Sequence, residues 1–341
     1  MTFDDLKYLR LANQHLLAPA DAHTVVRDLC GVQAQFLSNA FHALTIRSDD
    51  FSVDRPDGLL KSWTLRGTMH LFDERDLPLM LYRDRTHFLR PCDMLAADEY
   101  ITAERKRFFA DLIEKSVGEG ISEREALKQH CFDAGMTETE AQSVFNPWGG
   151  TIRALCEAGR ITHAVSEKKA FVPCTPFEPM KREEARLELA RRYFVHYGPA
   201  TVRDAAYFLG FTQAEIRKML AQLPVKEISC GERAQYYIEE RAHECGEIPP
   251  CILLAGFDPL MLGYEKKDNP FLPMEHLRGI FSLAGIVMPA VLLRGRVVGR
   301  WKRTGRKLTI ALFEAIDAQG KADICREAER LFGSLKSIEG M

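Results

Sequence analysis

The sequence predicts an α+β fold, mainly α-helical, made of tandem winged-helix (helix-turn-helix) units with a C-terminal β-rich segment. Apolar residues recur at helical spacing behind residues that favour helix N-caps, and short alternating segments follow these helices. The same order then recurs along the 341 residues. We expect one unit over residues 1–96, a second over 97–178 and a third over 179–341, the last with a basic β-hairpin region and a C-terminal helix.

The first unit begins with apolar residues at helical spacing, which predict a helix over residues 3–17. Asp21 is a typical N-cap for a second helix that ends before Gly31. Ser38 is the expected N-cap of a third helix. The segment KSWTLRGTMHLF, residues 61–72, alternates weakly and predicts a strand or hairpin.

The second unit repeats this order. Ser122 is the expected N-cap of its first clear helix, because Glu125 follows three residues later. Residues 151–174 then predict a helix, a strand, a turn at 167–169 and a second strand. Two prolines and mixed charges place a boundary near residue 178.

The third unit gives the clearest helix-turn-helix pattern. A long helix is expected to end at Gly198, and Thr201 starts a short helix that stops at Gly210. Thr212 caps the next helix, and residues 225–240 follow as a hairpin.

Further along the chain, residues 287–313 predict strands joined by turns at Arg294-Gly295 and Thr304-Gly305. Residues 321–336 predict a helix that closes this segment.

The composition excludes several classes of protein. The chain has 46 Lys and Arg against 48 Asp and Glu, with 46% hydrophobic residues, as in ordinary globular proteins. It has no apolar run of about 18 residues and no signal-peptide pattern, so we expect a cytoplasmic protein without a membrane partner. Its nine cysteines are odd in number and lack C-x-x-C spacing, which predicts neither disulfides nor a zinc site. We expect no metal and no organic cofactor.

A local basic segment stands out in this nearly neutral chain, because no acidic residue occurs from His276 to Phe313. Seven cations within fourteen residues predict phosphate contacts, and Trp301 among them could stack on a base. The alternative is a solvated sheet face neutralised by acids such as those in residues 227–247. The candidate DNA-binding residues are Arg294, Arg296, Arg300, Lys302, Arg303, Arg306 and Lys307.

Gln33 and Gln35 form a second candidate site. Their side chains share one side only if the segment is extended, since the side-chain period of a strand is two. Val32 and Ala34 would then pack inward while the two amides hold a water or a polar group. The alternative is that these glutamines cap neighbouring helices.

Four further residues are weaker candidates for supporting roles. Arg66, Thr68 and His70 lie in the predicted hairpin, where Arg66 and His70 could contact phosphate or His70 could carry a proton. Asp258 offers a carboxylate at an Asp-Pro turn. The phosphate-loop, dinucleotide-binding, zinc-protease and nucleophile-elbow motifs are absent.

Four segments together, CGVQAQ, WTLRGTMHLF, LLAGFDPLMLGY and VVGRWKR, resemble the AlkZ/YcaQ-type DNA glycosylase family, also classed as a winged-helix DNA-binding family. They occur in the same order along nearly the whole chain. The resemblance implies three winged helices around a DNA channel and hydrolysis of the N-glycosidic bond of N7-alkylated purines. It also implies unhooking of bulky adducts or interstrand crosslinks.

The resemblance further implies catalytic roles for Gln33 and Gln35, which match the Gln-x-Gln branch of the family, whereas the other branch has Asp at the second position. The resemblance also implies a hairpin that contacts DNA, which we assign to residues 294–307. The expected partner is double-stranded DNA with an alkylated purine, without an obligate protein partner. A cytoplasmic, nucleoid-associated location follows.

An N7-alkylated purine is cationic and leaves readily, so the enzyme mainly has to place a water near an oxocarbenium-like sugar. We expect Gln35 to hold that water and Gln33 to orient it or the sugar. A winged-helix transcription regulator without catalysis is the alternative. A weaker possibility is an enzyme that acts on a natural product and uses winged helices only as a scaffold.

Overall fold

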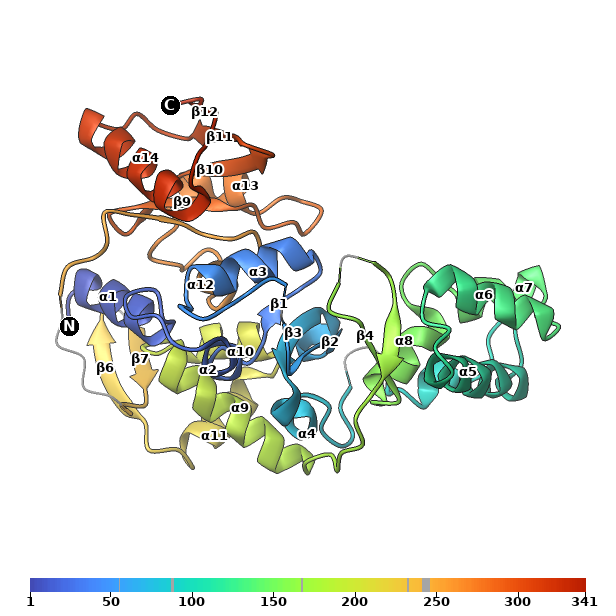
Figure 1. Ribbon diagram of the computed structural model, residues 1–341. Coiled ribbons are helices and arrows are strands. Elements are labelled where there is room, and N and C mark those ends of the chain that lie inside the picture. The colour runs from blue at the N-terminus through green and yellow to red at the C-terminus, as the bar shows by residue number, and fades with distance from the viewer. Residues whose placement is uncertain (55, 87–88, 167, 232, 241–245) are drawn as a thin grey trace. The chain divides into compact units, whose positions relative to one another are not determined.

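The computed structural model describes residues 1–54, 56–86, 89–166, 168–231, 233–240 and 246–341, and it combines helices with mostly antiparallel strands (Figure 1). The chain divides into two compact units: Met1–Arg55 together with Leu187–Met341, and Pro56–Arg186. These units follow packing, whereas the ranges 1–96, 97–178 and 179–341 follow repeated local order and stay a prediction. No helix in the described ranges is both long and apolar enough to cross a membrane.

The discontinuous unit contains helices from both ends of the chain. Its N-terminal helices are α1 (Phe3–Asn13), α2 (Ala22–Asp28) and α3 (Leu37–Thr45). Its later helices are α9 (Arg182–His196), which begins just before the unit boundary, α10 (Val202–Leu209), α11 (Gln213–Leu220), α12 (Pro259–Leu262), α13 (Leu277–Ile280) and α14 (Ala318–Phe332). A 3₁₀ turn, Met274–His276, precedes α13.

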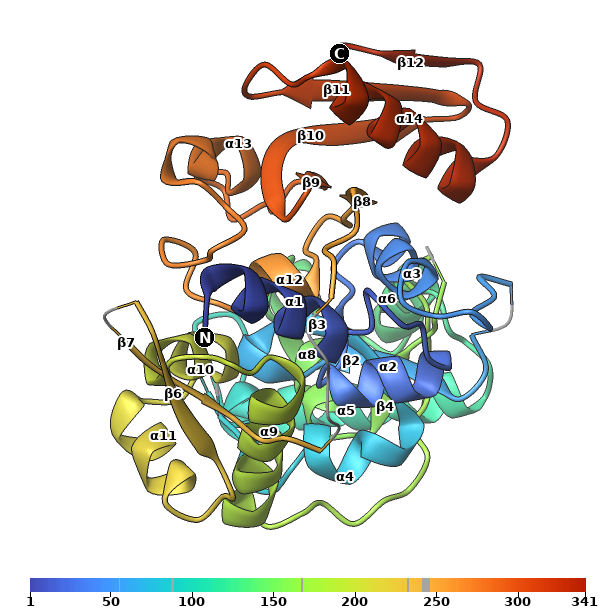
Figure 2. The same ribbon diagram turned by 90° about the vertical axis from the view of Figure 1, so that its left-hand side faces the viewer.

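The strands of this unit form a sheet and a separate hairpin. The sheet has the order β12-β11-β10-β9-β8, antiparallel except where β11 meets β12, and α14 packs against it (Figure 2). These strands are β8 (Cys251–Leu253), β9 (Ala290–Leu293), β10 (Arg296–Thr304), β11 (Lys307–Leu312) and β12 (Ser337–Glu339). The hairpin consists of β6 (Lys226–Cys230) and β7 (Arg233–Tyr237), and the short strand β1 covers Val32–Gln33.

The contiguous unit has its own core. Its strands β2 (Leu59–Trp63), β3 (Met69–Asp73), β4 (Ile161–His163) and β5 (Phe171–Pro173) pair in the order β3-β2-β4-β5. Its helices are α4 (Leu77–Met80), α5 (Ala103–Gly118), α6 (Arg124–Asp133), α7 (Glu138–Val144) and α8 (Gly150–Glu157), with 3₁₀ turns at Leu65–Gly67, Glu74–Asp76 and Asp93–Leu95. Buried residues such as Phe109, Ile113 and Leu155 fill the space between them.

Several local predictions are confirmed. Asp21 accepts a hydrogen bond from the backbone of Thr24 and caps α2. Thr201 and Thr212 each form a capping box, and Gly210 ends α10 in the left-handed conformation with a φ of 72°. These features use short-range hydrogen bonds and glycine's freedom at positive φ, which is why the sequence alone predicts them.

Other helix ends differ from the prediction. The first helix ends at Asn13 rather than near residue 17, because His15 takes a left-handed φ of 59°. Ser38 is not a cap: Phe36 is the N-cap residue of α3 and makes no side-chain cap hydrogen bond.

Two further boundaries move by one or two residues. Ser122 is not a cap, since its carbonyl accepts from the Phe171 backbone and Glu123 becomes the N-cap residue of α6. The helix expected to end at Gly198 ends at His196. Of the expected turn at 167–169, residue 167 lies outside the described residues.

A buried ion pair fixes α3 within the discontinuous unit. Arg47, just beyond α3, donates two hydrogen bonds of 2.6 and 3.1 Å to Asp258, and both side chains are fully buried. Asp258 also accepts from the backbone of Leu260 and so caps α12. The pair therefore joins the end of α3 to the start of α12.

Replacing Asp258 with Ala should lower the free energy of unfolding by about 3–5 kcal/mol, because Arg47 would remain buried without its partner. Urea unfolding followed by circular dichroism measures the change. Glu339→Ala is the control: Glu339 pairs with Lys307 at the surface, where an ion pair contributes little. Equal effects of the two substitutions would contradict the anchoring role of Asp258.

His163 should make stability depend on pH. Burial among aromatic rings lowers its pKa to about 3, and its Nε2 has no hydrogen-bond partner among the described residues. Between pH 6.5 and 3 the unfolded chain binds a proton that the folded chain does not, so stability falls as the pH falls. We expect His163 to cost roughly 2 kcal/mol between pH 6.5 and 5. Unfolding curves of His163→Phe should show a correspondingly flatter pH dependence than the unsubstituted protein; parallel curves would refute this.

Candidate active site

The segment that carries Gln33 and Gln35 is extended, as its sequence predicts. Two left-handed residues, Cys30 with φ 56° and Gly31 with φ 82°, turn the chain out of α2 and into β1. Positive φ is costly for a residue with a side chain, and such strain persists only where surrounding contacts enforce it. The turn therefore sets the direction in which the two glutamines leave the helix.

The two glutamines differ in exposure. Val32 and Ala34 are each 1% exposed and pack inward, as expected. Gln33 is buried at 8% exposure, whereas Gln35 is exposed. Within the part of the chain that the structure describes, neither side-chain amide has a hydrogen-bond partner, so the alternative that they cap neighbouring helices is not observed. Both amides are available to bind a water or a polar group.

The segment 251–262 packs along α3, which begins two residues after Gln35. A Cβ at Gly256 would lie 2.6 Å from the amide nitrogen of Asn39, so any larger residue would displace the Asn39 side chain. The rings of Phe36 and Phe257 stack with centroids 5.8 Å apart. Together with the buried pair at its C-terminal end, these contacts hold α3 along its length.

His42 links α3 to the C-terminal sheet. Its Nε2 donates a hydrogen bond of 2.7 Å to the carbonyl of Leu253, at the end of β8. Burial lowers the pKa of His42, although the hydrogen bond to Leu253 opposes this effect. The ring lies 4.9 Å from that of Trp301 on β10, which donates its indole N–H to Leu254. His42 is therefore a neutral donor that aligns α3 with β10.

A pocket of about 660 Å³ adjoins this contact. Residues of α3 and β10 contribute polar and cationic side chains to its lining: Ser38, Asn39, His42, Arg300, Lys302 and Arg303. The N-terminal turn of α3, which follows Gln35 directly, thus opens onto a cationic strand. Such a surface suits the phosphates of a nucleic acid.

The seven cations of the basic segment fall into two groups. Three pair with carboxylates: Arg294 with Asp317 and Asp323, Arg296 with Glu275 and Glu314, and Lys307 with Glu339. Among the described residues, Arg300, Lys302, Arg303 and Arg306 have no carboxylate partner. The neutralising acids thus come from outside residues 227–247, contrary to the alternative drawn from the sequence.

Trp301 does not have the exposure that base stacking requires. It is 9% exposed and packs against His42 and Phe332. The prediction that it stacks on a base is therefore wrong for this conformation. The alternation of β10 explains why, since Trp301 faces the core while its neighbours Arg300 and Lys302 are exposed.

Comparisons with known proteins agree with this geometry. The family model described as "DNA glycosylase AlkZ-like" matches residues 26–333. The chain belongs to this AlkZ-like family of DNA glycosylases.

A curated relative from Streptomyces sahachiroi, named "Interstrand DNA cross-link repair glycosylase", is 28% identical over 320 residues, covering 86% of this chain and 85% of its own. The solved structure of the Streptomyces sahachiroi DNA glycosylase AlkZ is 21% identical, covers all of both chains and has a TM-score of 0.76, which shows a shared fold.

Family membership makes this AlkZ-like protein a DNA glycosylase, which is a hydrolase acting in DNA repair. A transcription regulator without catalysis and an enzyme acting on a natural product are therefore not favoured. The DNA substrate also accounts for a cationic surface in a chain with a net charge of −2.

The weaker candidates of this AlkZ-like glycosylase make structural contacts. Arg66 lies at φ 54° in the turn Leu65–Gly67, where Thr68 donates its hydroxyl proton to Leu65. His70 is buried, with its Nδ1 2.9 Å from the Thr64 hydroxyl. Both contacts shape the β2–β3 hairpin.

Sequence reasoning missed Asn39, His42 and Arg47, which position the candidate site from α3. Their partners lie more than 200 residues away along the chain, so no local spacing predicts them. The sequence pointed to these residues only indirectly. Their partners lie in LLAGFDPLMLGY and VVGRWKR, two of the four segments that carry the family resemblance.

Replacing Arg300 and Lys302 together with Ala should weaken binding to duplex DNA and lower the slope of log K against log salt by about 2. Fluorescence anisotropy at several KCl concentrations gives the slope. The control, Arg294→Ala with Lys307→Ala, removes the same charge from residues already paired with acids. It should change the slope much less, and an equal change would argue against the pocket as the DNA contact.

Proposed function

We propose that this glycosylase hydrolyses the N-glycosidic bond of N7-alkylated purines in duplex DNA, with Gln33 and Gln35 as its catalytic residues. One observation supports this most directly. An extended segment holds two side-chain amides that have no partner among the described residues, and it leads straight into a helix whose first turns line a cationic pocket.

In the proposed mechanism the charged base leaves by itself, and the enzyme positions the attacking water. N7-alkylation leaves the purine positively charged, so the base departs without being protonated by the protein. The carbonyl oxygen of the exposed Gln35 amide accepts a hydrogen bond from the attacking water. As the water oxygen bonds to the sugar carbon and the base leaves with the electrons of the broken glycosidic bond, the water proton passes to solvent. The buried amide of Gln33 orients that water or the sugar. Positioning and fixed dipoles then supply the rate enhancement at the oxocarbenium-like transition state.

This mechanism predicts selectivity for damaged bases. Two neutral amides do not supply the charge stabilisation that a carboxylate gives to a sugar cation. An uncharged purine leaves poorly without protonation, so unmodified DNA stays intact. The neutral pair thus restricts hydrolysis to bases that already carry a positive charge.

Exposed cations on β10 hold the DNA backbone in this proposal. Arg300, Lys302 and Arg303 meet phosphates beside the lesion without reading its sequence, since phosphate contacts carry no direct sequence information. Binding then depends on salt and on the lesion rather than on a sequence motif.

Bulky lesions form part of the proposed substrate range, including interstrand crosslinks. A crosslinked base cannot rotate fully out of the duplex into a tight pocket. The pocket beside α3 is lined by long, exposed side chains such as Arg300 and Lys302. The name of the Streptomyces sahachiroi relative agrees with such a substrate.

We also propose that the fold is a tandem winged-helix arrangement acting on nucleoid DNA in the cytoplasm, without an obligate protein partner. The succession of α9, α10 and α11, followed by the β6–β7 hairpin, supports one such unit. Helices α5, α6 and α8, followed by β4 and β5, support another.

Replacing Gln35 with Ala should lower the single-turnover rate of N7-methylguanine release by about 100-fold, as expected for loss of one fixed polar contact to the reacting atoms. Released base and alkali-labile abasic sites are measured on a duplex with one lesion. Duplex affinity should stay unchanged. Gln129→Ala, the same substitution on the exposed face of α6, is the matched control and should retain full activity.

Two outcomes would count against parts of this proposal. Normal release by Gln35→Ala would remove Gln35 from the mechanism, and absence of release by the unsubstituted protein would remove N7-methylguanine from its substrates. In the same assay, a duplex crosslinked through two guanine N7 atoms should be unhooked. Failure on that substrate alone would confine the enzyme to adducts on one strand.

A further inference from the structure

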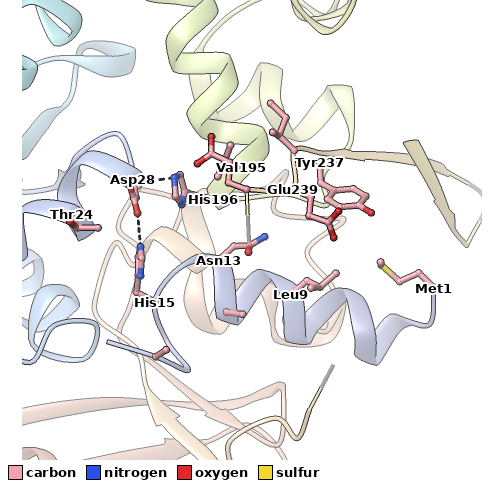
Figure 3. Close-up of a pocket in the computed structure, with 14 residues that line it drawn as sticks. Met1, Leu9, Asn13, His15, Thr24, Asp28, Val195, His196, Tyr237 and Glu239 are labelled. Carbon is pink, nitrogen blue, oxygen red and sulfur yellow. Dashed lines mark hydrogen bonds and ion pairs between the residues drawn. The ribbon is translucent and has the colours of Figure 1, made fainter. Parts of the chain in front are cut away.

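Three side chains outside the proposed DNA site converge on one point. The Nε2 atom of His15 lies 2.8 Å from Oδ2 of Asp28, and the Nε2 atom of His196 lies 3.3 Å from Oδ1 of the same carboxylate. One ligand-type atom from each residue lies within 4.8 Å of the others. Figure 3 shows both rings directed at Asp28, with the pocket extending past Asn13.

Each member of this cluster comes from the end of a helix. His15 follows α1 and keeps the left-handed φ of 59°, while Asp28 is the last residue of α2 and His196 the last of α9. His15 is 5% exposed, and the other two are partly buried. One carboxylate thus contacts two histidines from distant parts of the sequence: His15 lies 13 positions from Asp28, and His196 lies 168 positions from it.

When His196 is neutral, it has no N–H left to donate to Asp28. The His196 ring also donates a hydrogen bond to the backbone of Asn13. A neutral imidazole has a single N–H, so the neutral ring then has no second proton for Asp28. Its Nε2 contact with the Asp28 oxygen therefore brings two groups that both accept protons to 3.3 Å. A cation between them would turn this repulsion into attraction.

We propose that His15, Asp28 and His196 bind a divalent transition-metal ion, with zinc as the preferred ion. Two imidazole nitrogens and a carboxylate oxygen form a ligand set that suits zinc and neighbouring metals. Bonds of about 2.0–2.1 Å in a tetrahedron separate ligand atoms by roughly 3.3–3.4 Å. The contact between His196 and Asp28 Oδ1 has this spacing already. His15 contacts the other oxygen, Oδ2, at 2.8 Å, so the carboxylate has to turn for one oxygen to ligate the ion together with both rings.

One further contact favours this ion. The hydrogen bond from the His196 ring to the Asn13 backbone is the kind of outer contact that typically orients a ligating histidine. Arg192 lies near enough to lower the pKa of Asp28 and opposes the ion, whereas Glu239 and Glu240 line the same pocket.

The adjoining pocket leaves room for a fourth ligand. It has a volume of about 320 Å³ and is lined by the three cluster residues together with Asn13, Thr24 and Glu239. A water in this space would complete the tetrahedron. The cysteine pattern did not predict this site, because none of the proposed ligands is a cysteine. The ligands also lie far apart in the sequence, so they form no local motif.

An ion at this point would be structural, because it would join the ends of three helices. Other contacts already run between α9 and the end of α2. Arg192 donates to the carbonyl of Arg27, and the hydroxyl of Tyr197 donates to that of Leu29. Asp28 lies five residues before Gln33, so the ion would strengthen the support of the chain that enters the β1 segment.

Metal binding is tested on the tag-free, chelator-treated full chain. Zn²⁺ is titrated in competition with a chromophoric chelator, and Co²⁺ is added separately to record the visible absorption of a tetrahedral complex. We expect one Zn²⁺ per chain, a rise in the thermal midpoint with Zn²⁺ and none with Mg²⁺. Asp28→Asn and His196→Gln should each lower zinc affinity by more than about 100-fold, since loss of even an outer contact costs about 10- to 100-fold.

His23→Ala is the matched control, because it removes an imidazole of α2 that lies outside the cluster. It should retain both the zinc affinity and the cobalt spectrum. Thermal unfolding without metal establishes that each variant is folded, and two different substitutions keep the test decisive if one of them is not. The proposal is overturned if the unsubstituted chain binds no stoichiometric zinc, or if the folded cluster variants bind zinc as tightly as it does.

Discussion

The buried pair of Arg47 and Asp258 is the constraint on which the candidate site depends. Two charges are removed from water, and their mutual hydrogen bonds, together with backbone groups such as the Leu260 N–H that bond to Asp258, compensate for that loss. The pair fixes the C-terminal end of α3. The close contact between Gly256 and Asn39 and the hydrogen bond from His42 to Leu253 hold the helix at two further points along it. With α3 in place, the direction of Gln35 and the position of the cationic strand follow. The proposed catalytic pair of two amides would need this rigidity, because positioning is all that two amides would contribute.

Local signals account for most of what the sequence predicted correctly. Asp21, Thr201 and Thr212 act through hydrogen bonds to residues three positions away, and the Arg294-Gly295 turn acts through its own backbone. The extended form of the Gln33 segment followed from Gly31 and from the burial of its apolar neighbours. The predicted N-caps Ser38 and Ser122 were wrong, because tertiary contacts place the starts of α3 and α6 one or two residues away from the predicted positions.

Long-range pairing explains what the sequence did not predict. Arg47 and Asp258 lie 211 residues apart, as do His42 and Leu253, and neither pair leaves a periodic pattern. The division of the basic segment into paired and unpaired cations depends on acids contributed by a 3₁₀ turn, a loop, α14 with its N-cap, and β12. Charge counting along the chain gave the sign of this surface but not the residues that remain available to DNA.

The discontinuity of the larger unit has a consequence for how the protein is made. Residues Pro56–Arg186 form a contiguous unit with its own core, which can fold as soon as it leaves the ribosome. The Gln33 segment is synthesised earlier, and its supports, Leu253, Asp258 and β10, follow more than 200 residues later in the chain. The proposed catalytic pair therefore gains its full support only after most of the chain has been translated, so chains that end before β10 lack part of that support.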